Sequence, residues 1–545
     1  MKDSWNRIAL LSLVLVLGIA WLPAIAHDQT RKSFFKSQQR RLARAQQLQA
    51  AAAEATCQVK IQLVDADSGR SLAGLLRVTD LSRNEAIHLP ELIQREQDWY
   101  AIAVGGQVKL PRKRLKLEVL HGITTGKVEQ VLDLRGLDKR TLKIALQRFY
   151  DPAARKLVSG NTHLHLMRLT HAEAHRYLST VPEADNLDLV FLSHLRRLPD
   201  ERDYISNQFT DADLQRLSRQ RVLFGNGEEH RHNFGRGGEG YGHVMLLDLV
   251  KLIRPVSIGP GIMRSGTDGL PLQRGIQTAH KDGATVIWCH NTFGFEDIPN
   301  WLGGLLDAQN IFDGGSHGSY EDSFYRYLNL GLRVPFSTGT DWFIYDFNRV
   351  YVPVEGKLTV KKWLQSLAQG RSYITNGPLL EFQIGQSSAG DTIRQDQPGP
   401  LRITARAVGR ADFGQLQLVH NGKVINTQKG VNKEGHFQAE FKISADVSQS
   451  GWFAVRVAAS KAKNALGHLP FAHTSPIYVE VPGRPLFAPE IARELIKEIR
   501  QGVETIEAKG TFANEEERDR VFKVYQQGIR DLEQRLKDHA ASNRR

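Results

Sequence analysis

The sequence predicts an α/β protein in which a central parallel sheet or barrel is flanked by two β-sandwich domains and followed by a helical segment. Near-continuous apolar runs alternate with helical pieces over residues 155–385, a pattern typical of a parallel sheet covered on both faces. Runs of alternating polarity over residues 58–150 and 386–483 indicate short strands of half-buried sheets. Apolar residues at helical spacing predict a helical tail over residues 486–545.

The composition is ordinary for a globular protein. The chain has 545 residues, of which 41% are hydrophobic and 24% charged, and this excludes a fully disordered chain and a polytopic membrane protein. Only two cysteines are present, Cys57 and Cys289, which excludes a disulfide scaffold and a cysteine-rich zinc module. The sequence leaves open whether these two thiols pair.

The N-terminal segment has the features of a secretory signal peptide. Lys2 and Arg7 flank the start of an apolar run over residues 8–22, and the small-residue site Ala24-Ile25-Ala26 follows it. The run is shorter than the roughly 20 apolar residues that a membrane-spanning helix needs. We therefore expect residues 1–26 to be removed, and the mature protein to be periplasmic or secreted without a transmembrane span.

Residues 31–57 predict a basic helical lead-in, because Arg, Lys, Gln and Ala dominate the segment. Apart from Phe34 and Phe35, the cations are not interleaved with aromatic residues, as they are in tracks that bind single-stranded nucleic acid. No nucleic-acid partner is therefore expected. The sequence does not predict an oligomeric state.

The two flanking domains are each predicted from short alternating strands. In the first, residues 59–64, 115–119 and 142–146 alternate, and we expect a small antiparallel sandwich with a supporting or binding role. In the second, Asn421-Gly422 is a hairpin signal between alternating runs. In the tail, the spacing from Ile496 to Ile506 predicts a helical hairpin packed on the body.

Chemistry-bearing residues gather in the central stretch. Of the 19 histidines, 11 fall between positions 163 and 317. His163-Leu164-His165 places two imidazoles on the same side of an extended strand, where both can reach one ion. Further candidates stand where an apolar run ends or begins: His194, Glu228, Glu229, His243, His290 and Asp341. Because the carboxyl ends of parallel barrel strands meet at one face, these side chains predict a site for zinc, manganese or iron.

Several longer motifs resemble a known family. The run from Ser159 to His165 resembles the opening metal motif of the polymerase-and-histidinol-phosphatase (PHP) superfamily. Residues 325–335, 337–341, 348–352 and 370–378 resemble the carbaryl-hydrolase-like CehA/McbA family of metallohydrolases. The resemblance covers about residues 155–390, and it implies a distorted (β/α)7 barrel of the PHP type with a clustered site for divalent metal ions.

The resemblance also implies which residues bind metal. His163 and His165 match the first ligand pair, and in Gly227-Glu228-Glu229 the family's G-x-E pattern favours Glu229. The other positions that match family ligands are His194, His243, His290 and Asp341. The sequence departs from the pattern two residues after Asp341, where PHP proteins often have a histidine and this chain has Phe343. Either His317 or His232 replaces that ligand or one ion is missing, so the number of ions is between one and three.

These ligands predict a metal-dependent hydrolase that uses metal-activated water on an ester, carbamate or phosphoester bond. A bound metal lowers the pKa of its water to about 7, and Asp341 can accept the proton. Arg349 or Arg371 can stabilise the developing oxyanion. The expected substrate is a small or envelope-derived molecule. The alternative is a non-catalytic envelope scaffold or binding protein whose barrel is degenerate.

Three other motifs are interpreted without a catalytic or cofactor-binding role. Residues 235–240 fit G-x-G-x-x-G but follow a polar stretch, so we expect a loop over the site and not a dinucleotide-binding turn. Residues 314–318 fit the G-x-S-x-G serine-hydrolase motif, but no clear strand precedes them. His230-Arg231-His232 is a second H-x-H, which we interpret as solvated loop histidines.

Overall fold

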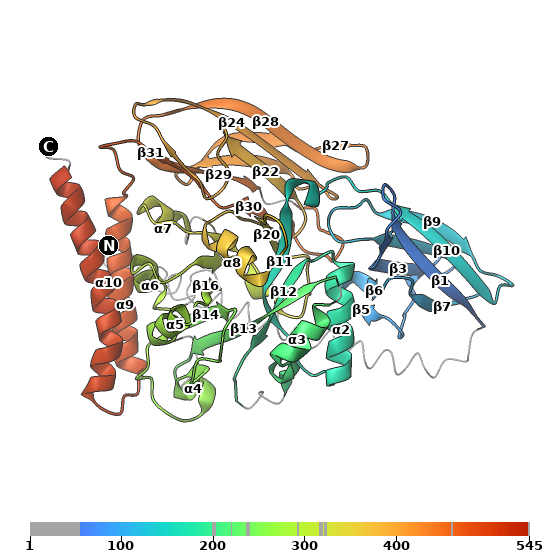
Figure 1. Cartoon of the computed structure of the whole chain (residues 1–545), viewed down its shortest axis with the longest axis horizontal. Coiled ribbons are helices and arrows are strands. Elements are labelled where there is room, and N and C mark those ends of the chain that lie inside the picture. The colour runs from blue at the N-terminus through green and yellow to red at the C-terminus, as the bar shows by residue number, and fades with distance from the viewer. Residues whose placement is uncertain are drawn as a thin grey trace, which may run out of the picture.

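The computed structural model describes residues 55–198, 203–219, 221–235, 240–290, 294–315, 320, 324–458 and 461–542. The predicted signal peptide and most of the predicted lead-in lie outside these residues. Within the described part of the chain, no helix is both long and apolar enough to cross a membrane. The protein has a mixed α/β fold, rich in strands, with a curled half-barrel sheet and additional sheets (Figure 1).

Two sheets enclose the core of the N-terminal region. One contains β1 (Thr56–Asp65), β2 (Ser71–Leu72), β7 (Gln107–Pro111) and β10 (Lys139–Leu146). The other contains β3 (Gly74–Asp80), β4 (Glu85–Ala86), β5 (Ile93–Gln94), β6 (Tyr100–Ile102), β8 (Arg114–Leu120) and β9 (Val128–Asp133). A short 3-10 helix, η1 (Glu96–Asp98), precedes β6. The expectation of a purely antiparallel sandwich is wrong at one place, because β1 and β10 run parallel over eight paired residues.

The central sheet curls into a half-barrel. Its strands are β11 (Leu157–His165), β12 (Leu189–His194), β13 (Leu223–His232), β14 (Gly242–Leu247), β15 (Ser257–Ile258), β16 (Thr285–Cys289), β17 (Ala308–Asn310), β18 (Phe336–Ser337) and β19 (Asp341–Trp342). Most neighbours are parallel, and β19 returns to pair with β11. The expectation of parallel strands throughout is wrong at β14, which runs antiparallel to both β13 and β16.

The reversed strand still serves the same edge of the sheet. In the ladder, His243 at the start of β14 lies opposite Arg231 near the end of β13, and opposite Cys289 at the end of β16. An antiparallel strand begins where its neighbours finish. The first residues of β14 therefore join the carboxyl ends of the parallel strands.

Short helices connect the central strands. They are α2 (His171–Ala184), α3 (Asp211–Leu217), α4 (Pro260–Met263), α5 (Leu272–Lys281), α6 (Asp297–Leu302), α7 (Phe324–Asn329), α8 (Val360–Ala368), η2 (Ala153–Arg155), η4 (Ile205–Gln208) and η5 (Asp313–Gly315). Helices α2 and α3 each begin with a capping box, formed by Thr170 with Glu173 and by Thr210 with Asp213. These caps satisfy backbone donors at the helix starts and fix where each connection turns.

The C-terminal strands form one separate sheet and an extension of the central one. The separate sheet contains β22 (Leu379–Ile384), β24 (Gly399–Gly409), β27 (Val431–Lys433) and β28 (His436–Val447). The extension contains β20 (Arg349–Pro353), β21 (Tyr373–Thr375), β23 (Thr392–Arg394), β25 (Gln415–His420), β26 (Lys423–Lys429), β29 (Gly451–Val457), β30 (Ala472–Thr474) and β31 (Ile477–Glu480). Hydrogen-bonded pairing runs from β11 through β20, β21 and β30 to β29.

Two long helices, α9 (Pro489–Lys509) and α10 (Glu515–Ser542), form a hairpin at one side of the molecule (Figure 1). Their apolar faces bury Leu495, Ile499 and Tyr525 in a core cluster shared with the central region. The hairpin is also tied to the body by hydrogen bonds, since Asp268 and Thr511 exchange two of them, each 2.8 Å long.

Candidate metal centre

Two histidines on β11 form the start of the centre. Alternation along the strand turns His163 and His165 to the same side, and both are fully buried. The Nδ1 atom of His165 lies 2.9 Å from the carbonyl oxygen of Ser193, which can only accept, so Nδ1 carries the hydrogen. The Nδ1 atom of His163 lies 2.7 Å from Oδ2 of Asp313 and donates in the same way. Both Nε2 atoms are therefore left as electron-pair donors in the neutral rings.

The two Nε2 atoms face one another across 2.9 Å. Two carboxylates approach the same point. Oε2 of Glu229, on β13, lies 3.1 Å from Nε2 of His165, and Oδ1 of Asp341, on β19, lies 3.3 Å from Nε2 of His163. One ligand atom from each of these four residues lies within 4.8 Å of all the others. Lone pairs and anionic oxygens directed at one point favour a positive charge there.

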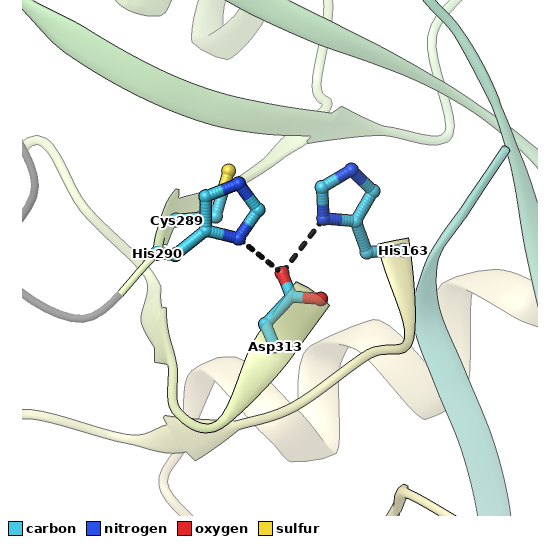
Figure 2. Close-up of side chains that lie close together, drawn as sticks. All are labelled: His163, Cys289, His290 and Asp313. Atoms are coloured by element: carbon cyan, nitrogen blue, oxygen red, sulfur yellow. Dashed lines mark hydrogen bonds and ion pairs between the residues drawn. The ribbon is translucent and has the colours of Figure 1, made fainter. Parts of the chain in front are cut away.

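Two further histidines extend the cluster. Nδ1 of His243 lies 3.2 Å from Oε1 of Glu229, so the carboxylate of Glu229 stands between β11 and β14. Figure 2 shows His163 and His290 on either side of Asp313, whose Oδ2 lies 3.2 Å from Nδ1 of His290. Nε2 of His290 lies 3.8 Å from Oδ2 of Asp341. Three overlapping groups of ligand-type residues therefore share one buried region.

Asp313 orients two imidazoles at once. A single oxygen of its carboxylate accepts from the Nδ1–H groups of His163 and His290, and the two rings stack with centroids 5.4 Å apart. Carboxylates that hold the far nitrogen of a metal-binding histidine fix its tautomer and ring direction. Asp313 thereby turns the Nε2 atoms of both rings toward Asp341.

The charges of the centre favour ionised carboxylates. Nη1 of Arg231 lies 3.3 Å from Oε1 of Glu229. Burial alone would raise the pKa of Glu229, but Arg231 and the neighbouring histidines hold it well below the usual range. Burial and Arg231 lower the pKa of His243 to about 3, which keeps that ring neutral and able to bind metal. Burial raises the pKa of the Cys289 thiol, so this residue is a neutral neighbour in Figure 2.

The pKa of His163 is raised, in contrast to that of His243. Burial would lower it, but Asp313 and Asp341 outweigh burial and raise the pKa of His163 to about 9. The site therefore attracts a positive charge, either a proton or a metal ion. Ligands bound to one zinc ion at about 2.1 Å lie roughly 3.4 Å from one another in a tetrahedron. The separations between these nitrogen and carboxylate oxygen atoms, 2.9–3.9 Å, are of this size, so the donor set is compatible with a divalent metal ion.

The structure brings together six of the residues that the sequence singles out: His163, His165, Glu229, His243, His290 and Asp341. His194 is in none of the three groups; it is half-buried at the end of β12, and burial and Arg254 lower its pKa to about 4. Glu228 points to the other face of β13, where it contacts His230 at 3.0 Å and accepts from the Ile253 amide at 2.7 Å. His317 lies outside the described residues.

Two predicted roles do not agree with the geometry. Arg349 is fully buried, and its guanidinium donates to the carbonyl oxygens of Phe347 and Asp185, each at 2.9 Å, instead of facing the metal ligands. Its role is to hold the loop before β12 against β20. The expectation of solvated loop histidines at 230 and 232 is also wrong, because both are fully buried on β13 and His232 lies 2.8 Å from Asp268.

Asp313, Arg231 and Cys289 join the centre without having been predicted there. Asp313 follows β17, whose polar residues do not look like a buried strand. Gln309 accepts a hydrogen bond from the Trp301 indole at 2.8 Å, and Asn310 accepts one from Thr162 at 3.0 Å. Side-chain pairing of this kind lets polar residues be buried. The one signal for Asp313 in the sequence is that an acidic residue comes just after a short segment of the half-barrel.

Comparison of the chain with protein-family models, with curated proteins and with solved structures finds no match. The chemistry of the centre is therefore inferred from its own residues.

Proposed function

We propose that the protein is a metal-dependent hydrolase that cleaves an ester, carbamate or phosphoester bond. The observation that carries this proposal is the convergence of two imidazole Nε2 atoms, 2.9 Å apart, with an oxygen of Glu229 3.1 Å from that of His165 and an oxygen of Asp341 3.3 Å from that of His163. Imidazole and carboxylate ligands together suit zinc, manganese and iron. The family resemblance of residues 155–390 supports the same reaction class.

His163, His165, Glu229 and Asp341 would hold the ion, with His243 and His290 placed to complete one or two further sites. A bound divalent ion supplies a Lewis acid that polarises the scissile group and lowers the pKa of a water molecule to about 7. The side chains of this chain supply the geometry and the proton acceptor for that chemistry.

Asp341 is the group we assign to take the proton of the attacking water. Its two oxygens lie between His163 and His290, at 3.3 and 3.8 Å from their Nε2 atoms. Arg231 keeps Glu229 ionised, so that a proton lost at the centre is not taken up by Glu229. Trp342 packs on the ring of His165 with centroids 5.3 Å apart, and Tyr204 packs on Trp342, so an apolar wall shields this side of the centre.

We infer the substrate class from the reaction class, and not from the shape of a pocket. We propose a small or envelope-derived molecule, in keeping with the signal-peptide features of residues 1–26. Asn376-Gly377-Pro378, within the family-like motif, shapes a turn, since Asn376 donates to Asp346 at 2.7 Å and to the Leu469 carbonyl at 2.9 Å.

Metal analysis combined with a substrate panel tests the proposal. The purified protein is analysed by plasma mass spectrometry and assayed with a nitrophenyl ester, a naphthyl carbamate and a bis-nitrophenyl phosphodiester. We expect bound transition metal, hydrolysis of at least one substrate, and loss of both in His163→Ala and His165→Ala. His175→Ala, on the exposed face of α2, is the matched control and should change neither.

Two outcomes would contradict the proposal. Protein without metal and without activity after incubation with zinc, manganese and iron would favour the non-catalytic scaffold. Hydrolysis that survives both histidine substitutions would place the reaction elsewhere in the molecule.

A further inference from the structure

A second chemical environment lies away from the metal centre, between the central sheet and the C-terminal sheet of β22, β24 and β28. It is a cleft of about 740 Å³. This is within the size range of small-molecule sites in proteins. Among the described residues, the cleft and the metal centre have no lining residue in common. Arg371, which the sequence suggested for the metal centre, lines this cleft instead.

Aromatic rings form much of the cleft wall. Tyr150, Tyr351, Tyr373, Phe382 and Phe441 all line it. The rings of Tyr351 and Tyr373 are stacked, with centroids 5.1 Å apart and planes at 23°. Flat apolar surfaces of this kind favour a ligand that also has a flat apolar body.

The charged lining is predominantly cationic. Four cations line the cleft against two carboxylates, Glu381 and Glu440. Glu381 is already neutralised, because Arg155 lies 2.8 Å from it and Arg406 lies 3.3 Å from it. The remaining cations are Arg371 and Lys442, both exposed, and neither has a side-chain hydrogen bond or ion pair within the described parts of the chain. The cleft therefore has positive charge available to a ligand.

Two residues of the cleft wall carry buried hydroxyl groups. Tyr150 and Tyr373 are 4% and 5% exposed, and their hydroxyls have no hydrogen-bond partner among the described residues. Burial raises the pKa of both phenols, and Glu381 adds to the effect, so both stay protonated. A buried donor without an acceptor costs free energy, so this part of the cleft wall is less well satisfied than most of a protein interior.

We propose that this cleft is a binding site for a small organic anion with an aromatic body, such as an aromatic carboxylate or sulfonate. The aromatic wall takes the flat body, while Arg371 and Lys442 pair with the acid group. This site is independent of the proposed hydrolase activity, because it uses none of the metal-binding residues.

Fluorescence titration with two related probes tests the proposal. Anilinonaphthalenesulfonate has the acid group and an aromatic body, and N-phenylnaphthylamine has a similar body without charge. We expect one sulfonate per protein molecule, with affinity that falls as salt is added. The double variant Arg371→Gln/Lys442→Gln should bind the sulfonate roughly tenfold or more weakly and the uncharged probe about equally.

The control removes the same charge outside the cleft. Lys429→Gln/Lys433→Gln changes two exposed lysines of β26 and β27 that do not line it, and should leave sulfonate affinity unchanged. Ala389→Trp, which fills the cleft without changing charge, should weaken both probes. His163→Ala protein should bind the sulfonate normally, which separates this site from anion binding at the metal centre.

Three results would overturn the inference. These are equal sulfonate affinity in the wild type and the Arg371/Lys442 variant, an equal loss in the Lys429/Lys433 control, or loss of binding in His163→Ala. Thermal unfolding of each variant shows whether it is folded. The two surface double variants keep the test valid if Ala389→Trp does not fold.

Discussion

Two buried histidine–carboxylate groups each include one residue of β13, His232 in one and Glu229 in the other, and they behave differently. At His232, Nδ1 accepts from the Tyr241 amide at 3.0 Å, so Nε2 donates to Oδ1 of Asp268 at 2.8 Å. The other oxygen of Asp268 accepts from the Thr511 amide at 2.8 Å. Both ring nitrogens and both carboxylate oxygens are used, and the group joins the body to the helical hairpin.

In the metal centre the same residue types leave their electron pairs directed at one another. His163 and His165 each use Nδ1 as a donor, and their Nε2 atoms meet at 2.9 Å beside Glu229. The difference teaches that burial next to a carboxylate does not identify a metal site. What favours one is the convergence of two imidazole nitrogens and two carboxylate oxygens on a single point that attracts positive charge.

The largest effect is expected from the carboxylate that only the metal centre uses. Glu229→Gln should weaken metal binding by more than about a hundredfold, since even a residue beside a ligand contributes tenfold to a hundredfold. Glu228→Gln, one residue away and facing His230, is the control and should leave metal affinity unchanged. Calorimetric titration of metal-free protein with zinc measures both. Equal losses would show that Glu229 is not the ligand.

The carboxylates that hold histidine rings in the two groups, Asp313 and Asp268, permit a direct comparison. Asp313→Asn should weaken metal binding roughly tenfold to a hundredfold, because His163 and His290 lose the acceptor that fixes their rings. Asp268→Asn, which alters the same kind of contact at His232, should leave metal affinity as it is. If both variants bind zinc like the wild type, Asp313 has no orienting role.

A pH measurement tests a buried histidine outside the metal centre. His473 is closed, in the sense that both of its ring nitrogens are hydrogen-bonded. Nδ1 donates to the Thr474 carbonyl and Nε2 accepts from the Tyr325 hydroxyl, each at 2.7 Å. Burial lowers its pKa from 6.5 to about 3. Because the unfolded chain takes up the proton first, stability present above pH 6.5 is lost as the pH falls toward 3.

Between pH values of about 6.5 and about 5, His473 should account for up to about 2 kcal/mol of this loss. Urea unfolding at the two pH values, compared between the wild type and His473→Gln, measures it. The variant should lose correspondingly less stability on acidification. The same pH dependence in both proteins would mean that His473 is not the group responsible.

The smallest effect is expected for the stability of Asp268→Asn. The substitution removes the charge from a hydrogen-bonded group and should cost about 1 kcal/mol of unfolding free energy. Thermal unfolding measures it, and His175→Ala on the exposed face of α2 serves as the reference. A destabilisation by Asp268→Asn no larger than that of His175→Ala would show that the closed group adds no stability.

Sequence patterns locate a candidate metal ligand where an apolar strand leads to it. His163 and His165 lie within β11, and His290 directly follows β16, so strand periodicity and position were enough to select them. His243 was selected although β14 runs in the unexpected direction, because either end of a strand marks a sheet edge. The pattern of apolar residues does not show whether a short connection reverses the direction of the next strand.

Other residues were beyond the pattern because their roles depend on contacts between distant segments. Asp313 is reached through a polar strand whose side chains are hydrogen-bonded to Trp301 and Thr162. Arg349 was selected for its charge alone, while its contacts are with the carbonyls of Phe347 and Asp185. His230 and His232 continue β13 beyond its apolar part, because Glu228 and Asp268 pair with them.

The ladder from β11 through β20, β21 and β30 has a consequence for how the chain can be shortened. Residue 386 divides two sequence patterns, yet β21 on one side of it pairs with β30 on the other. A fragment ending there would leave the backbone amides and carbonyls along β21 without their neighbour. Such an open strand is a template for other chains. The half-barrel and the strands after residue 386 are thus expected to fold, express and remain monodisperse only as one piece.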